Sequence, residues 1–426
     1  MAETTANGAP AARDADSARD ATQSFLFTLI ALTFAMNLLG RGVTETFAVF
    51  LLPVQKGLGV TRADITLTYS TYMLAYGLSA PFAGQLIDRF GARITYGFGL
   101  ACLGGGYFLA GFATSLWQYS LCVGLLGGLG AASLGMIIAS GLISRWFTHR
   151  VGWVMSLPYA AMGAGMLILP PLTQLLLTHY DWRFTHRLLG AGVLLVLPLV
   201  MLLPLERMTQ GSAAWREMRA KAMSSGAGPW TVSTAVRTSA FWGLFVAYLF
   251  TSIAAYAVLP HSVAYLVERG IDPLAAASAF GMTGMLSVVG IICVGWASDN
   301  FGRRQTATLT YCSSIIGVAL LIAVTRWPSL LLAYGFVLFF GLMQGARGPI
   351  IVSMVTTLFP GGGIGAIYGT LSMAMGLGAG VGSWVSGLLY TATGSYIASF
   401  VLAITASAAG MATFWVVPAL REERVT

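Results

Sequence analysis

Between two long apolar runs the chain reads Gly84-Gln85-Leu86-Ile87-Asp88-Arg89-Phe90-Gly91-Ala92-Arg93. The pattern recurs 211 positions later as Gly295-Trp296-Ala297-Ser298-Asp299-Asn300-Phe301-Gly302-Arg303-Arg304, with Gly, Asp, Phe, Gly and the last Arg in the same register. Self-similarity at about half the chain length indicates two copies of one structural unit.

The charged side chains of the first copy are costly among lipid tails, so Asp88, Arg89 and Arg93 must lie where helices meet water. Gly91 permits a tight turn there because it lacks a Cβ. An acid followed by arginines can cap a helix and pair with a neighbouring helix end. The pattern therefore predicts a polar latch between helix ends. A solvated loop is the alternative, which the matched second copy disfavours.

The two copies resemble the loop signature of the major facilitator superfamily, and the resemblance extends from about residue 25 to about residue 418. It implies an all-α integral membrane protein with 12 transmembrane helices in two pseudo-symmetric six-helix halves. It also implies a gate that closes the cytoplasmic side. The gate residues carried over are Gly84, Asp88, Arg89, Gly91, Arg93, Asp299, Gly302 and Arg304. Asn300 replaces the first arginine in the second copy, so we expect a weaker network there.

The composition agrees with a membrane protein. Only 9% of the residues are charged, 57% are hydrophobic and 52 are glycine, which excludes an ordinary soluble domain. The net charge of +8 does not indicate a nucleic-acid partner, because the basic residues are scattered through short connections. The four cysteines lie within apolar runs without ligand-like spacing, so we expect neither a disulfide nor a metal site.

Apolar runs of spanning length, separated by polar or Gly- and Pro-containing turns, predict twelve helices. They cover residues 25–54, 65–87, 94–113, 117–145, 151–178, 185–204, 238–266, 274–298, 304–325, 329–358, 364–392 and 395–418. The predicted domains are a disordered N-terminus at 1–22, a six-helix bundle at 23–205, a cytoplasmic linker at 206–237, a second six-helix bundle at 238–418 and a C-terminal tail at 419–426. The first apolar run is too long for a cleavable signal.

The positions of lysine and arginine predict the orientation. With both termini cytoplasmic, the inside receives fifteen of these residues and the outside six. We expect this arrangement in the inner membrane of a bacterium. Arg41 and Arg347 lie within helices and complete the total of 23.

A second repeat relates the fifth and eleventh helices. Its first copy is Phe147, Gly152, Gly163 and Gly165, and its second is Phe359, Gly365, Gly376 and Gly378. Small residues let backbones approach closely, which suits helices that rock against their neighbours, although static tight packing is the alternative. Two repeated halves are typical of alternating access.

The sequence contains no constellation typical of an enzyme. It has no His–Cys cluster, no phosphate-binding glycine loop beside Lys-Ser or Lys-Thr, and no pair of acids at catalytic depth. We therefore expect no enzymatic activity and no cofactor. The lack of a nucleotide site also argues against an ATP-driven pump, so transport would use an existing gradient.

Ionisable residues within the helices are the first candidates for function. Glu45 is the only acid well inside a helix, and Arg41 lies four residues earlier on the same face. The two can neutralise each other and lower the cost of insertion. Alternatively they face a central cavity, where Arg41 contacts an anionic substrate and Glu45 carries a proton.

Arg347 has no acid nearby in its own helix and lies roughly 11 residues, or about 17 Å, from the cytoplasmic end. Its neighbours Gly345, Gly348 and Pro349 loosen the helix and free backbone groups that can line a cavity. We expect its guanidinium to bind a substrate carboxylate. A salt bridge to Glu45 across the two halves is the alternative.

His261 follows Pro260 near the outer end of the seventh helix and can titrate near neutral pH. It is a second candidate for proton coupling, or else a hydrated interfacial histidine. Tyr69, Tyr72 and Tyr76 form a stripe on the second helix, a pattern that more often indicates packing. If the stripe faces the cavity, Tyr72 and Tyr76 contact the substrate and suit an aromatic solute.

Within the superfamily the chain is similar to the bacterial monocarboxylate and oxalate:formate branch. The similarity lies in Phe47-Ala48-Val49-Phe50, in Trp146-Phe147 to Gly152, and in Arg347-Gly348-Pro349 leading to Phe359 and Gly365-x-x-Tyr368-Gly369. Two features depart from that branch: positions 287–296 carry no arginine, and the eleventh helix has no lysine.

The resemblance implies a secondary active transporter that moves a small organic anion, coupled to protons or by exchange. A carrier of a larger aromatic solute or vitamin and a membrane solute sensor are the alternatives. We expect a monomer whose partners are a small-molecule substrate and the lipid bilayer.

Overall fold

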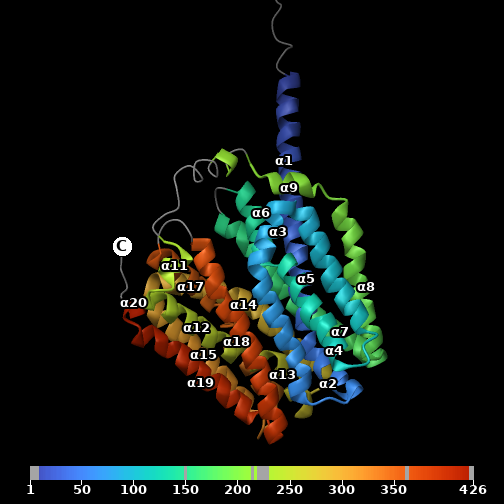
Figure 1. The fold of residues 1–426 in the computed structure, drawn as a ribbon, viewed down its shortest axis with the longest axis vertical. Coiled ribbons are helices and arrows are strands. Elements are labelled where there is room, and N and C mark those ends of the chain that lie inside the picture. The colour runs from blue at the N-terminus through green and yellow to red at the C-terminus, as the bar shows by residue number, and fades with distance from the viewer. Residues whose placement is uncertain (1–8, 148–150, 213–214, 218–229, 360–363, 422–426) are drawn as a thin grey trace, which may run out of the picture.

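The computed structural model describes residues 9–147, 151–212, 215–217, 230–359 and 364–421 (Figure 1). Within these ranges all the regular elements are helices. The N-terminal half contains α1 (Ala9–Glu45), α2 (Phe47–Leu58), α3 (Arg62–Ala110), α4 (Leu116–Tyr119), η1 (Ser120–Leu126), α5 (Gly127–Leu134), α6 (Met136–Trp146), α7 (Val151–His179), α8 (Trp182–Met201) and α9 (Leu205–Gln210).

The C-terminal half contains α11 (Val232–Ala235), α12 (Ser239–Tyr256), α13 (Leu259–Glu268), α14 (Pro273–Phe301), α15 (Arg303–Ala323), α16 (Leu330–Phe336), η2 (Val337–Gly341), α17 (Arg347–Leu358), α18 (Ile364–Thr393), α19 (Ile397–Val416) and α20 (Pro418–Arg421). The segments η1 and η2 are π-helical.

The described helices account for the twelve predicted spans. Within the described ranges nine segments are long and apolar enough to cross a membrane. α3 supplies two more, because Gly91 adopts φ 79° and ψ 175° and divides its 49 residues. The interrupted segment 330–358 supplies the last. The all-α fold with twelve membrane-spanning helices is therefore confirmed.

Four spans are interrupted near the middle of their length, at equivalent places in the two halves. α1 meets α2 at Thr46, and α12 meets α13 at Ala257–Val258. In the fourth span Gly135 is extended between α5 and α6, and in the tenth Gly345 has a φ of 76° between η2 and α17. A π-helical segment lies ahead of each of the last two breaks. The shared breaks support the pseudo-symmetry of the halves.

Glycines of α7 and α18 bring the two halves into close contact. A methyl group at Gly163 would lie 2.6 Å from the carbonyl oxygen of Gly284 in α14. A methyl group at Gly376 would lie 3.1 Å from Cα of Gly77 in α3. Two positions further along each helix, Gly165 approaches α1 and Gly378 approaches α12, each the first membrane span of its own half. Equivalent glycines of the second repeat thus make equivalent contacts.

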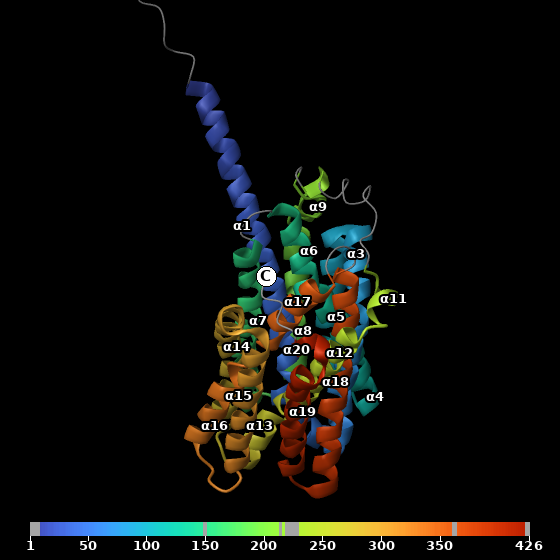
Figure 2. The same cartoon turned by 90° about the vertical axis from the view of Figure 1, so that its left-hand side faces the viewer.

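The two halves touch at one end of the bundle and separate at the other. We call the end that carries α9 the linker end, and the opposite end, which carries α2, the far end (Figures 1 and 2). Toward the far end, the Ser70 hydroxyl of α3 donates to the Gly380 carbonyl of α18 at 2.7 Å. Toward the linker end, a methyl at Gly84 would meet only Ile137 of its own half, and one at Gly369 would meet no described atom within 4 Å.

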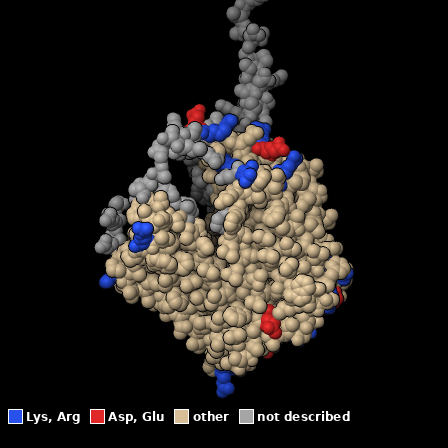
Figure 3. All heavy atoms as spheres, in the orientation of Figure 1, with Lys and Arg blue, Asp and Glu red and all other residues tan. Residues whose placement is uncertain are grey.

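The outer surface of the bundle is apolar. On the face shown in Figure 3 the charged side chains gather mainly at the linker end and along the edges of the molecule, with a few toward the far end, and most of the surface between them is uncharged. Large apolar side chains are exposed on the periphery, among them Leu195, Leu331 and Val416. Exposure of so much apolar surface to water would be unfavourable. This apolar belt is therefore the surface that faces lipid.

α1 begins at Ala9 and projects from the linker end (Figure 1), whereas composition predicts disorder for residues 1–22. Six of the fourteen residues in 9–22 are alanine, the best helix former, which gives a physical reason for the difference. Residues 1–8 lie outside the described residues. In the predicted linker 206–237 the structure describes two short helices, α9 and α11, while 213–214 and 218–229 are likewise outside.

Candidate functional site

A cavity of about 350 Å³ lies between the two halves, where they begin to separate. It is bordered by the breaks of the interrupted spans, since Met136 begins α6, Tyr256 ends α12 and Arg347 begins α17. Its lining contains Arg41 and Arg347, the five tyrosines Tyr76, Tyr159, Tyr248, Tyr256 and Tyr368, and the polar residues Ser140, Thr251, Ser252, Ser287, Gln344 and Ser372. Among the described residues no acid lines it.

Arg347 is a buried cation held by neutral partners. Its Nη2 donates to the Thr310 carbonyl at 2.8 Å and to the Ser314 hydroxyl at 2.5 Å, and its Nε donates to the Thr310 hydroxyl at 3.2 Å. Its guanidinium carbon lies 4.1 Å from the ring centroid of Tyr311. Within the described part of the chain it forms no ion pair. The cavity therefore has one positive charge that no described acid neutralises.

Arg41 and Glu45 pair with each other. Arg41 Nη2 lies 2.5 Å from Glu45 Oε1, a distance typical of an ion pair. Arg41 lines the cavity and donates to the Tyr256 hydroxyl of the other half at 3.3 Å. Glu45 is 2% exposed and does not line the cavity. This is the geometry of the self-neutralising alternative, and among the described residues Arg347 and Glu45 form no ion pair with each other.

The tyrosine stripe of α3 approaches the cavity at one end. Tyr76 lines the cavity itself, whereas Tyr72 lines a neighbouring space of about 20 Å³ together with Arg41. The rings of Tyr72 and Tyr76 are stacked with centroids 6.2 Å apart. Tyr69 lies further away and packs its ring 6.1 Å from that of Tyr256.

His261 is fully buried and lies outside the cavity lining. Its Nε2 is 3.1 Å from the Ser383 carbonyl, and its Nδ1 is 3.3 Å from the Tyr396 hydroxyl. Because a carbonyl can only accept, Nε2 carries the proton and Nδ1 accepts from Tyr396. The structure therefore differs from the interfacial alternative, which expects a hydrated side chain.

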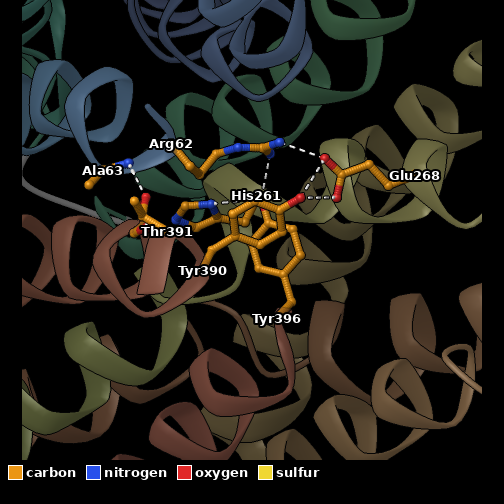
Figure 4. A network of polar contacts seen from close by, with 8 residues as sticks. Arg62, Ala63, His261, Glu268, Tyr390, Thr391 and Tyr396 are labelled. Atoms are coloured by element: carbon orange, nitrogen blue, oxygen red, sulfur yellow. Dashed lines mark hydrogen bonds and ion pairs between the residues drawn. The ribbon is translucent and has the colours of Figure 1, made fainter. Parts of the chain in front are cut away.

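The His261 side chain belongs to a polar cluster that joins the halves at the far end (Figure 4). Arg62 of α3 lies 2.5 Å from Glu268 of α13 and donates at 2.5 Å to the Tyr396 hydroxyl. The Tyr390 hydroxyl donates to both Glu268 oxygens at 3.2 Å. We call Arg62, Glu268, Tyr390 and Tyr396 the far-end latch. Burial raises the pKa of the Tyr396 phenol, so this hydroxyl keeps the proton that it donates to His261.

The family model of the Major Facilitator Superfamily matches residues 30–340 and 286–426. The chain belongs to the major facilitator superfamily. The resemblance predicted from the two glycine-containing loops is thereby confirmed, and with it the assignment to a family of membrane transporters.

Curated relatives cover most of this superfamily chain. Monocarboxylate transporter 13 of Bos taurus is 28% identical over 88% of this chain and 85% of that protein. Monocarboxylate transporter 11 of Homo sapiens is 27% identical over 88% and 79%, respectively. YcxA of Bacillus subtilis, described as an uncharacterized MFS-type transporter, is 23% identical over 87% and 89%. The predicted similarity to the monocarboxylate branch is confirmed.

Solved structures of the superfamily share the fold. A D-xylose–proton symporter superposes with a TM-score of 0.71 at 14% identity, over 93% of this chain and 99% of that one. A bacterial homologue of the human lysosomal transporter Spinster gives a TM-score of 0.72 at 14% identity, over 92% and 98%. At this identity the likeness concerns the fold alone.

The superfamily loop glycines adopt the backbone that a tight turn requires, with φ 79° at Gly91 and φ 88° at Gly302. Arg93 Nη1 lies 3.1 Å from Glu206 Oε1 of its own half. The guanidinium carbon of Arg304 lies 4.5 Å from the ring centroid of Trp415, also in its own half. Arg89 is exposed and lies over its neighbour Phe90. The side chains of Asp88 and Asp299 lie outside the described residues.

None of these described loop contacts crosses between the halves, as expected where the halves are apart. The gate role of the loops stays a prediction.

Sequence reasoning missed several cavity residues. Tyr159, Tyr248 and Tyr256 lie in apolar helices, and nothing in their sequence context distinguished them from core residues. Tyr368 lay within a quoted motif but was not assigned a role. Arg62 was only one of the six lysines and arginines assigned to the outside. Its acid partner lies 206 positions away, so no local pattern indicated the pair.

Proposed function

We propose that this chain is a secondary active transporter that works by alternating access and moves a small organic anion of the monocarboxylate type. The observation that carries the proposal is Arg347, which is 7% exposed, has neutral partners and borders a cavity without a described acid. An unpaired guanidinium in a membrane protein costs several kcal/mol. A substrate carboxylate offsets that cost and matches the guanidinium with two parallel hydrogen bonds.

Arg41 has a secondary role in this proposal. Its charge is already compensated by Glu45, so it contributes a hydrogen bond to the substrate rather than a net charge. Tyr76 contacts the bound anion from α3, and Tyr72 supports it from behind.

Alternating access is supported by the asymmetry of the contacts between the halves. The far-end latch and the glycine contacts of α7 and α18 hold one end closed, while α3 and α18 are apart at the linker end. Opening of the far end would break the far-end latch. The two linker-end loops, Gly84–Arg93 and Gly295–Arg304, would then come together. We assign the linker end to the cytoplasm of a bacterium from the distribution of lysine and arginine, so this conformation is open to the inside.

Coupling is to protons or by exchange, with Glu45 and His261 as the candidate proton carriers. Both side chains are buried and hydrogen-bonded or paired, so either needs a conformational change to exchange a proton. We propose a monomer as the transporting unit, because one chain contains both halves and the whole cavity.

Counterflow in proteoliposomes tests the proposal. Liposomes loaded with unlabelled pyruvate, lactate or another monocarboxylate should take up the same labelled anion transiently. Arg347→Gln should abolish this uptake, while the matched change Arg326→Gln in an exposed connection should retain it. Equal uptake by the Arg347 variant would refute the role of this guanidinium, and absence of counterflow with every anion would refute anion transport.

A further inference from the structure

The cavity is walled by aromatic rings that do not stack on one another. Its five tyrosines come from four helices, α3, α7, α12 and α18. Within the described part of the chain no ring pair joins two of them. The ring contacts of Tyr76 and Tyr256 are instead with Tyr72 and Tyr69, which lie behind the lining. Aromatic surface therefore remains available to a ligand.

The rest of the apolar wall is adaptable. Five methionines line the cavity, namely Met73, Met136, Met162, Met166 and Met375. Methionine is flexible and polarizable and makes favourable contacts with the edges of aromatic rings. A small hydrated anion would leave these walls in contact with water, whereas a flat apolar body would cover them.

The charges of the cavity suit one carboxylate. Arg41 is neutralised by Glu45, and Arg347 is the second arginine of the lining. A second carboxylate would have to compete for Arg41, and Glu45, which is 2% exposed, would then be left as a buried charge without its partner. Breaking a buried pair in this way is strongly unfavourable. The site therefore favours a monoanion over a dianion.

The volume suits a ring with a short acidic side chain. An apolar cavity of about 150 Å³ is large enough to bind benzene. This cavity has about 350 Å³, which leaves space for a carboxylate and a short link beyond one ring.

We propose that the transported anion is an aromatic monocarboxylate, with its carboxylate on Arg347 and its ring among the cavity tyrosines. This inference rests on the proposed function and specifies its substrate class.

Counterflow and binding with four matched acids test the inference. Phenylacetate has one ring and one charge, cyclohexylacetate has the same length without aromaticity, acetate lacks the ring, and phenylsuccinate adds a second charge. We expect phenylacetate to be preferred over cyclohexylacetate by about two- to tenfold, the range of aromatic pair contacts beyond burial. Acetate and phenylsuccinate should both be poorer substrates than phenylacetate.

The other possible results would each overturn a stated part of the inference. Equal transport of cyclohexylacetate and phenylacetate would overturn the aromatic assignment, and preference for phenylsuccinate would overturn the single charge. Preference for acetate would overturn the substrate class but leave organic-anion transport intact, provided that uptake still depends on Arg347. Failure to bind or transport any of the four would overturn the substrate class, and counterflow of pyruvate and lactate would then decide separately whether the proposed function stands.

Variants of the lining separate ring contact from a structural role. Tyr76→Leu and Tyr159→Leu remove one ring each and should bring the ratio of phenylacetate to cyclohexylacetate uptake toward one. Tyr76→Phe and Tyr159→Phe keep the ring and should restore the ratio. A purely structural role would lower uptake of both acids together and leave the ratio unchanged, which would contradict the inference.

Discussion

Arg62 of α3 and Glu268 of α13 form the one ion pair that joins the two halves among the described residues, with 2.5 Å between Nη2 and Oε1. The Arg62 side chain is 3% exposed and that of Glu268 29%. Opening of the far end must therefore separate a buried guanidinium from its acid. Removal of the acid's charge makes the closed state less favourable, because Arg62 is then left buried without a counter-charge.

We predict that Glu268→Gln shifts the protein toward the conformation open at the far end. Because Glu268 is partly hydrated, we expect a loss of about 1–2 kcal/mol, or roughly 5- to 30-fold in the equilibrium between the two conformations. A cysteine introduced at Ser252 in the cavity lining, with the native cysteines replaced, should then react faster with an impermeant maleimide applied from the far-end side.

The matched control is Glu206→Gln, which removes the exposed pair with Arg93 inside one half and should leave the labelling rate unchanged. Equal labelling of the Glu268 variant and the parent would show that the far-end latch does not hold the halves together.

The loop acids should affect transport unequally. We predict that Asp88→Asn strongly reduces uptake while membrane insertion stays normal, since the change removes both a helix-cap interaction and a partner for arginine. Asp299→Asn should be milder, because Asn300 replaces an arginine in the second copy. Initial uptake rates, normalised to the amount of protein in the membrane, would decide the matter. Equal loss in both variants would mean that the two copies contribute alike.

Gly163 is predicted to tolerate no side chain in this conformation. A methyl group there would lie 2.6 Å from the Gly284 carbonyl oxygen, so Gly163→Ala must push α7 and α14 apart. Overpacking of this kind typically costs about 1–3 kcal/mol. We expect a lower melting temperature and slower transport. Gly192→Ala in α8 is the matched control, because a methyl there would meet no described atom within 4 Å. If both variants melt and transport alike, the close approach at Gly163 has no energetic consequence.

The sequence pattern predicted the features that depend on contacts between residues close together in the chain. The spacing of Arg41 and Glu45 on one helix face gave their pair as one of two interpretations, and the glycines of the loops were enough to expect turns at Gly91 and Gly302. The twelve spans followed from apolar runs, since hydrocarbon thickness sets their length.

Contacts between distant segments could not be derived in this way. Arg62 and Glu268 are 206 positions apart, and each by itself reads as an ordinary charge near a helix end. Sequence pattern does not separate Tyr159 and Tyr248 from packing residues, because a helix inside this protein is apolar both toward its neighbours and toward lipid. Only the packing of the two halves shows which of their aromatic residues border the cavity.

Arg347→Lys should separate charge from geometry. The variant keeps one positive charge, so we expect it to fold and insert, but an ammonium cannot form two parallel hydrogen bonds to a carboxylate. The loss of one charge-assisted hydrogen bond corresponds to about 10- to 100-fold in affinity. Substrate dissociation constants for the parent and the variant would check this. An unchanged affinity would show that a point charge at this site is sufficient.

Counterflow by Arg347→Gln, measured with and without Glu45→Gln, tests most directly whether Arg347 binds the substrate. Glu45 pairs with Arg41 in this structure, so its neutralisation should not compensate for the loss of Arg347. The account predicts that the single variant is inactive and that the double variant stays inactive. Recovery of transport in the double variant would contradict it, because Arg347 would then serve only to balance the charge of Glu45.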